Sequence, residues 1–167
     1  MKLKYDNDFW RFSLTVYSQN EVAKECLALQ DTLCIDVNIL LFCAWVGTRA
    51  VALNREDIER ASGAVTTWYE KVVCPLRAVR KITKTLSPDK KFAAAIEALE
   101  IKSEQIEQAI LFDFSRQLQS LPANRKPYDA VAENVNEYIE MKAQASLSLN
   151  SKLSARRLID AAKCLLS

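Results

Sequence analysis

The stretch Cys26–Trp45 reads CLALQDTLCIDVNILLFCAW and decides the fold, because two helical patterns meet in it around a short polar joint. The members of this polar joint are Gln30, Asp31, Asp36 and Asn38. The pattern that follows the joint is apolar nearly all round, which is typical of a helix buried at the centre of a bundle. We therefore predict a buried central helix near residues 37–51.

The composition favours helix along the whole chain of 167 residues. Only two glycines and four prolines occur, although sheet-rich folds need many tight turns that use these residues. The length fits one domain, and no segment reads as a linker between domains. We expect an all-α, single-domain bundle of about six to eight helices that spans residues 1–167.

Charge and cysteine usage limit the possible partners. The net charge of +2 is too small to indicate a nucleic-acid or membrane partner by itself. The first residues lack the apolar run of a secretory signal, and the uncharged stretch Val37–Thr48 near the central helix is too short to cross a bilayer. The five cysteines are expected to be reduced core residues, and zinc is disfavoured because the chain has no histidine. We predict a cytoplasmic protein without a cofactor or metal.

Capping residues and prolines mark several helix boundaries. Asp36 is expected to begin the central helix, and Ser87-Pro88-Asp89 to begin a long helix that reaches Leu121. Pro75 must bend or end its helix, since proline lacks an amide donor and clashes with the preceding turn. Because residues 76–86 resume a helical pattern, we expect either a kinked continuation or two abutting helices.

The polar joint is the first candidate for chemistry. Asp31, Asp36 and Asn38 are residue types that cap helices, so the simplest interpretation is that they pin a tight turn. Alternatively, Asp31 and Asp36 act as acidic ligands or acid–base groups. Asn38 shares a helix face with Leu41 and Trp45, so its amide would be buried and would need hydrogen-bond partners.

A cationic helix is the second candidate. Four basic residues fall within about 100° of one another on a helical wheel. They are Arg77, Arg80, Lys81 and Lys84. Arginine suits phosphate or carboxylate, because its guanidinium donates paired hydrogen bonds. A solvated surface is the simpler interpretation, and the glutamates between residues 97 and 107 could also neutralise the patch within the molecule.

Nothing in the sequence forms a catalytic set. Several aromatic residues could line an apolar pocket, although such residues more often form core. They are Phe9, Trp10, Phe12, Tyr17, Trp45, Trp68 and Tyr69. A nucleophile with a histidine base is excluded because the base is missing, and Gly47 and Gly63 are too isolated to form a phosphate loop. A non-enzymatic protein is therefore favoured.

Four motifs occur together in the first half of the chain. They are FWxFSLxxY from Phe9, CLxLQD from Cys26, DVNxLLFxxW from Asp36 and VVxPLRxxR from Val72. In combination they resemble an uncharacterised proteobacterial family of about this length, which carries a domain of unknown function. The resemblance covers residues 8–86 and implies a cytosolic helical protein, but it supplies no reaction, ligand or cofactor.

The resemblance also bears on two of the candidate regions. The family pattern includes the polar joint and both arginines of the cationic helix. The chain departs from the pattern at Leu33-Cys34, where a glycine would be usual in such a turn. The geometry of this turn is therefore left open.

Three functions remain as hypotheses. The leading one is a macromolecule-binding or regulatory protein that uses the cationic helix face at residues 77–91, with another protein or an anionic ligand as the partner. The second is a small-molecule-binding protein or enzyme in which Arg77, Arg80 and the polar joint line an interhelical pocket. Nucleic-acid binding is the third. Convergence of the arginines with the polar joint on one concavity would favour the second hypothesis.

Overall fold

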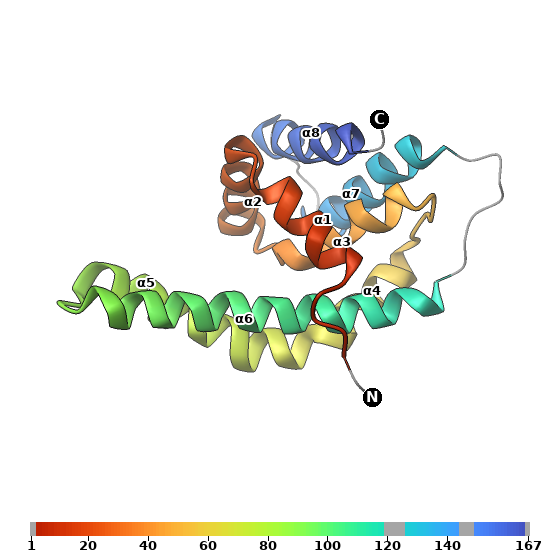
Figure 1. Cartoon of the computed structure of the whole chain (residues 1–167). Coiled ribbons are helices and arrows are strands. Elements are labelled where there is room, and N and C mark those ends of the chain that lie inside the picture. The colour runs from red at the N-terminus through yellow and green to blue at the C-terminus, as the bar shows by residue number, and fades with distance from the viewer. Residues whose placement is uncertain (1–2, 119–125, 144–148, 166–167) are drawn as a thin grey trace.

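The computed structural model describes residues 3–118, 126–143 and 149–165, and every regular element within them is a helix. The elements are α1 (Asp8–Tyr17), α2 (Asn20–Leu33), α3 (Val37–Thr48), α4 (Arg55–Trp68), η1 (Tyr69–Val73), α5 (Cys74–Leu86), α6 (Lys90–Phe114), η2 (Ser115–Gln117), α7 (Pro127–Ala143) and α8 (Leu149–Cys164). Figure 1 shows the long α6 running along one side of the other helices. The expected all-α bundle is confirmed.

Helix α3 is the buried centre of the bundle. All of its residues from Val37 to Gly47 are buried, and its most extensive packing is against α7. Asp36 begins the helix as predicted, because its side chain accepts a hydrogen bond of 2.9 Å from the backbone N–H of Asn38. The helix ends at Thr48, a little before the predicted end near residue 51, and Ala50 beyond it takes the left-handed conformation with φ of 56°.

The crossing of α3 and α7 is unusually close because α3 carries a glycine there. A Cβ atom added to Gly47 would lie 2.5 Å from the Cα of Val131 on α7. Contacts this short between a side chain and a backbone atom do not occur in folded proteins, so only glycine fits without separating the two helices. The isolated glycine is thus a packing residue.

The turn between α2 and α3 contains a residue in the left-handed conformation that is not a glycine. Cys34 caps α2 with φ of 51° and ψ of 36°, a region that glycine enters at the least cost. The turn is held from α7, because the Tyr138 hydroxyl accepts a hydrogen bond of 3.1 Å from the backbone N–H of Asp36. The presence of Cys34 in place of a glycine therefore costs conformational free energy at this turn.

The helix around Pro75 continues through the proline without a break in the chain direction. Between α4 and α5 the segment η1 is a π-helix, in which the N–H of Cys74 donates to the carbonyl of Tyr69 five residues back. The wider turn places Pro75 in the first turn of α5, where its missing amide donor removes no intrahelical bond. The expected continuation across the proline is explained by this π-turn.

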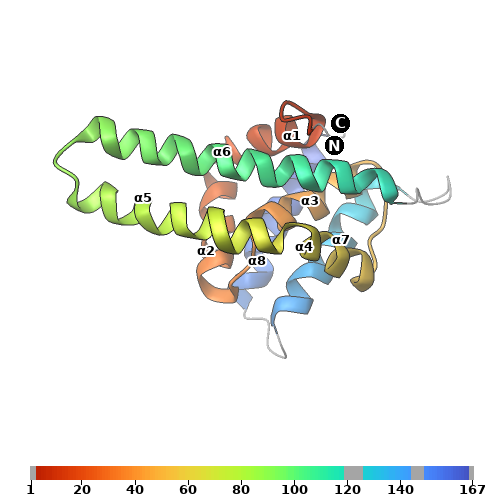
Figure 2. The same ribbon diagram turned by 90° about the horizontal axis from the view of Figure 1, so that it is seen from below.

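Helices α5 and α6 form an antiparallel hairpin that extends beyond the rest of the bundle (Figure 2). Its second helix starts later than predicted, because Asp89 is the N-cap and accepts hydrogen bonds from the backbone of Lys91 and Phe92. Ser87 lies before the helix and accepts a hydrogen bond of 3.2 Å from the Asp89 N–H. Helix α6 ends at Phe114, and the predicted end at Leu121 lies outside the described residues.

The cysteines only partly follow the prediction of core residues. Cys26 and Cys43 are buried, and Cys74 is partly buried. Cys34 and Cys164 are exposed, which corrects the expectation for these two. Their positions explain the difference, because Cys34 lies in the turn after α2 and Cys164 at the end of α8.

We expect Gly47→Ala to lower the free energy of unfolding by about 1–3 kcal/mol, because the added methyl group must push α3 away from α7. Urea unfolding followed by circular dichroism measures this change. Gly63→Ala is the matched control, since a Cβ at Gly63 meets nothing within 4 Å and alanine favours helix α4. Equal stability of the Gly47→Ala variant and the wild type would contradict the close crossing.

We expect Cys34→Gly to raise the free energy of unfolding by about 0.5–1 kcal/mol, because glycine removes the Cβ that penalises the left-handed conformation. Cys34 is exposed, so little packing is lost. The control is Cys34→Ala, which keeps the Cβ and should leave the stability near that of the wild type. Denaturant unfolding of the three proteins in a reducing buffer measures the effect, and a destabilised glycine variant would contradict it.

Candidate ligand site

A cavity of about 390 Å³ lies between α1, α2, α3, α5 and α6. We call it the interhelical cavity. One part of its lining is apolar and consists of Trp10, Leu14, Tyr17, Leu27, Val37, Leu41 and Ile101. The other part is polar and consists of Ser13, Gln30, Asn38, Arg77, Arg80, Glu97, Glu100, Glu104 and Gln108. Its size and mixed lining are those of sites for small organic molecules.

The two arginines of α5 line the cavity, and each is paired within the molecule. Arg77 donates to Glu100 at 3.2 Å, to Glu104 at 2.7 Å and to Gln30 at 2.8 Å. Arg80 also pairs with Glu100, which is only 4% exposed. A carboxylate this deeply buried needs such partners, because an unpaired charge in the interior would be strongly destabilising.

The glutamates that pair with these arginines have unequal surroundings. Burial raises the pKa of Glu104, and its hydrogen bond to Arg77 opposes that rise. Glu97, nearer the start of α6, is exposed at the cavity wall, and no ion pair joins it to either arginine in the described structure. The charges of the two arginines are therefore matched by acidic groups of α6 before any ligand enters.

A pair of buried carboxyl groups, Asp36 and Glu107, lies behind the polar wall. Glu107 is fully buried next to Asp36, and its Oε1 atom has no hydrogen-bond partner other than that carboxyl group. Burial and the nearby charge of Asp36 raise the pKa of Glu107 to about 10, and burial also raises the pKa of Asp36. Near neutral pH Glu107 is therefore protonated and shares its proton with Asp36.

Two side-chain amides connect this carboxyl pair to the cavity. Asn38 donates from Nδ2 to Glu107 Oε2 at 2.8 Å, and Gln108 donates from Nε2 to Asn38 Oδ1 at 2.8 Å. Gln108 Oε1 then has no partner, although the residue is only 3% exposed. Ser13 Oγ, on the α1 side of the same cavity, is also buried without a partner. Buried polar atoms normally have a partner, and these two, on side chains that line the cavity, lack one within the protein.

The structure separates the residues that the sequence grouped together. Asn38, Arg77 and Arg80 line the interhelical cavity, whereas Asp36 lies behind it in the carboxyl pair. Asp31 of the polar joint is exposed and does not line the cavity.

The four basic residues on the wheel of α5 do not form one free surface. Arg77 and Arg80 are partly buried against α6, and only Lys81 and Lys84 of the four are exposed. The ion pairs of Arg77 and Arg80 with glutamates of α6 show that these two charges are neutralised within the molecule, which was one of the two simpler interpretations of this face. The binding partner of the exposed lysines stays a hypothesis.

Several residues of the site were missed from the sequence. Gln108 and Ser13 had no assigned role, and Glu107 was considered only as a group that could neutralise the cationic helix, because their partners lie in other helices and only the fold brings them together. The signal was present in α6, where Glu100, Ser103 and Glu107 recur at helical spacing on the buried face. Phe92 and Leu99 on the same helix are about half exposed, whereas Glu100, Ser103 and Glu107 face inward.

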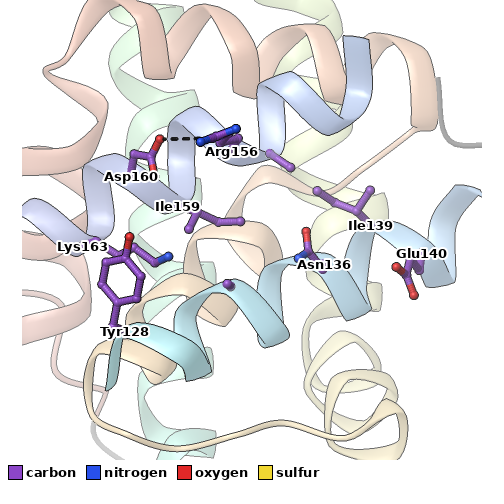
Figure 3. A pocket seen from close by; sticks show the side chains of 10 residues that line it. Tyr128, Asn136, Ile139, Glu140, Arg156, Ile159, Asp160 and Lys163 are labelled. Atoms are coloured by element: carbon purple, nitrogen blue, oxygen red, sulfur yellow. Dashed lines mark ion pairs between the residues drawn. The ribbon is translucent and has the colours of Figure 1, made fainter. Parts of the chain in front are cut away.

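A second hollow, of about 440 Å³, lies between α7 and α8 (Figure 3). Three of its charged groups have neighbours in the same hollow, since Arg156 lies 3.9 Å from Asp160 and the Lys163 ammonium lies over the ring of Tyr128. The Arg156 and Asp160 side chains are largely exposed. Among the described residues, none that lines this hollow has a buried polar side-chain atom without a partner, in contrast to the interhelical cavity.

A comparison with protein families matches residues 8–111, more than half of the chain, to the family described as a protein of unknown function, DUF2390. The chain belongs to this family. The match extends beyond the residues that carried the sequence resemblance. Every residue that lines the interhelical cavity lies within the matched segment, whereas the groove between α7 and α8 lies outside it.

Searches of curated proteins and of solved structures each found no match to the chain. In the described part of the chain, no helix has both the length and the apolar composition needed to cross a bilayer. The same residues contain no cluster of acidic residues and cysteines suited to hold a metal ion. The function of this family member must therefore be inferred from the cavity itself.

We expect the stability of the protein to fall as pH rises from about 5 to about 10, because folded Glu107 keeps a proton that the unfolded chain releases. The free energy of unfolding should decrease by up to about 1.4 kcal/mol per pH unit. In Glu107→Gln, which keeps a donor and an acceptor but cannot ionise, the decrease should be smaller.

Urea unfolding at a series of pH values measures this slope. Glu97→Gln is the control, since Glu97 is exposed on the same helix and should keep the slope of the wild type. If Glu107→Gln and the wild type lose stability at the same rate with pH, Glu107 is not protonated in the folded protein.

Proposed function

We propose that this DUF2390 protein binds a small organic molecule in the interhelical cavity. The observation that carries the proposal is the convergence of Asn38, Arg77 and Arg80 on one cavity, together with two buried polar atoms that have no partner there. A polar wall faces an apolar wall, so an amphipathic molecule would satisfy both. The lining comes from five helices, and a ligand would therefore also link them.

Binding is favoured over catalysis by the position of the ionisable groups. The carboxyl pair has the raised pKa values that enzymes use for acid–base steps, but neither Asp36 nor Glu107 lines the cavity. Glu104 does line it and also has a raised pKa, but its carboxylate is held in an ion pair with Arg77 at 2.7 Å. A general acid or base must come within hydrogen-bond distance of the reacting group. Asn38 and Gln108 stand between the pair and the cavity, which supports a structural role for the pair in orienting these amides.

A macromolecular contact at the end of the α5–α6 hairpin is a second candidate. Three apolar residues of α5 are exposed there, Val79, Ile82 and Leu86, the last of them by 74%. The exposed Lys81 and Lys84 lie on the same helix. An exposed apolar stripe of this kind is common at protein interfaces. Such a partner would be independent of the cavity, because the two arginines that face α6 would not take part.

The cavity proposal is tested with N-phenyl-1-naphthylamine, an uncharged probe that fluoresces when it enters an apolar site. We expect saturable binding to the wild type, and binding at least about tenfold weaker to Ser13→Phe, whose ring occupies the cavity. Thr15→Phe is the matched control, since Thr15 is exposed on the same helix outside the cavity and this variant should bind as the wild type does.

Circular dichroism verifies that both variants are folded. Absence of saturable binding to the wild type would contradict the proposal. Equal binding to the two variants would place the probe elsewhere, with the groove between α7 and α8 as the alternative site.

A further inference from the structure

The hydrogen bonds behind the cavity determine which chemical group the cavity can accept. Glu107 shares its proton with Asp36, so its other oxygen, Oε2, is an acceptor. Asn38 must therefore turn its NH₂ group toward Glu107 and its oxygen toward Gln108. Gln108 in turn uses its NH₂ group on Asn38. The atom of Gln108 that remains is the carbonyl oxygen, which can only accept.

The charges of the cavity wall also limit which ligand can bind. Arg77 uses all three guanidinium nitrogens on Gln30, Glu100 and Glu104, and Arg80 pairs with the same Glu100. The side chains of Glu97, Glu100 and Glu104 line the same wall, so an anionic ligand would add a further negative charge beside three acidic groups, which is unfavourable. The expectation of an anionic ligand, which followed from the arginines alone, is thus opposed by their partners.

We infer that the ligand of the interhelical cavity is an uncharged amphipathic molecule that donates an N–H or O–H group to Gln108 Oε1 and places its apolar part against α1 and α2. This inference rests on the proposed function. Gln108 supplies the acceptor, and Ser13 Oγ can either donate to the polar group of the ligand or accept from it. Trp10, Leu14 and Leu27 line the apolar part of the cavity. Primary amides and alcohols with a short hydrocarbon chain have the required chemistry.

A series of eight-carbon compounds tests the class of ligand by isothermal titration calorimetry at a fixed pH near neutrality. We expect octanamide to bind the wild type at least about tenfold more tightly than N,N-dimethyloctanamide, which keeps the carbonyl and the chain but has no N–H donor. Octanoate, which is an anion with no donor, should also bind at least about tenfold more weakly than octanamide.

The variant Gln108→Met tests the assigned acceptor. The variant should bind octanamide only as tightly as it binds the dimethyl compound. The affinity for the dimethyl compound should be the same as in the wild type. Gln105→Met is the matched control, because Gln105 lies on the same helix and does not line the cavity. If circular dichroism shows that Gln108→Met does not fold, the affinities of the wild type for the three compounds decide the class of ligand.

The outcomes separate this inference from the proposed function. If N-phenyl-1-naphthylamine binds in the cavity but octanoate or the dimethyl compound binds as tightly as octanamide, the inference is wrong and the cavity remains a ligand site. If neither the naphthylamine nor any eight-carbon compound binds, both are wrong. If octanamide is preferred but is unaffected in a folded Gln108→Met, the donor is recognised by another group and the assignment to Gln108 is overturned.

Discussion

Helix α3 has no face toward solvent, and the rest of the structure depends on that constraint. Its apolar side chains can be buried by any neighbours of the right shape, but the polar groups at its N-terminus need specific partners. Glu107 and Gln108 of α6 supply them for Asn38, and Tyr138 of α7 supplies one for the backbone of Asp36. The positions of α6 and α7 relative to α3 are therefore set by hydrogen bonds as well as by packing.

The arrangement of α5 follows from a different requirement. An acidic stripe on the buried side of α6 must be neutralised, and Arg77 and Arg80 do so from α5. These pairs hold the base of the hairpin next to α2, where Gln30 also contacts Arg77. The outer part of the hairpin lacks such contacts and keeps Leu86 exposed. The hairpin thus has an anchored, ion-paired base and an exposed end that carries both Leu86 and lysines.

The fold was more predictable from the sequence than the site. The all-round apolar pattern after Asp36 identified the central helix, since few other environments accept it, and Pro75 marked the change of helix type before α5. Asn38 and Arg77 were recognised as candidates by residue type and helix face. Glu107 was missed, because a glutamate within an amphipathic helix normally faces solvent, and only its contact with Asn38, 69 residues earlier, shows that it is buried. Side chains become a site through tertiary contacts, which local patterns do not contain.

The amide of Asn134 has a consequence for the limits of the folding unit. It joins three backbone groups around the end of α3, as it accepts from the Leu53 N–H and donates to the carbonyls of Cys43 and Val51. The family match ends at residue 111, well before Asn134. A recombinant fragment that ends at residue 111 would lack these three hydrogen bonds. It would also expose to water the side of α3 that packs against α7. The segment matched by the family therefore lacks the helix that packs most extensively against α3.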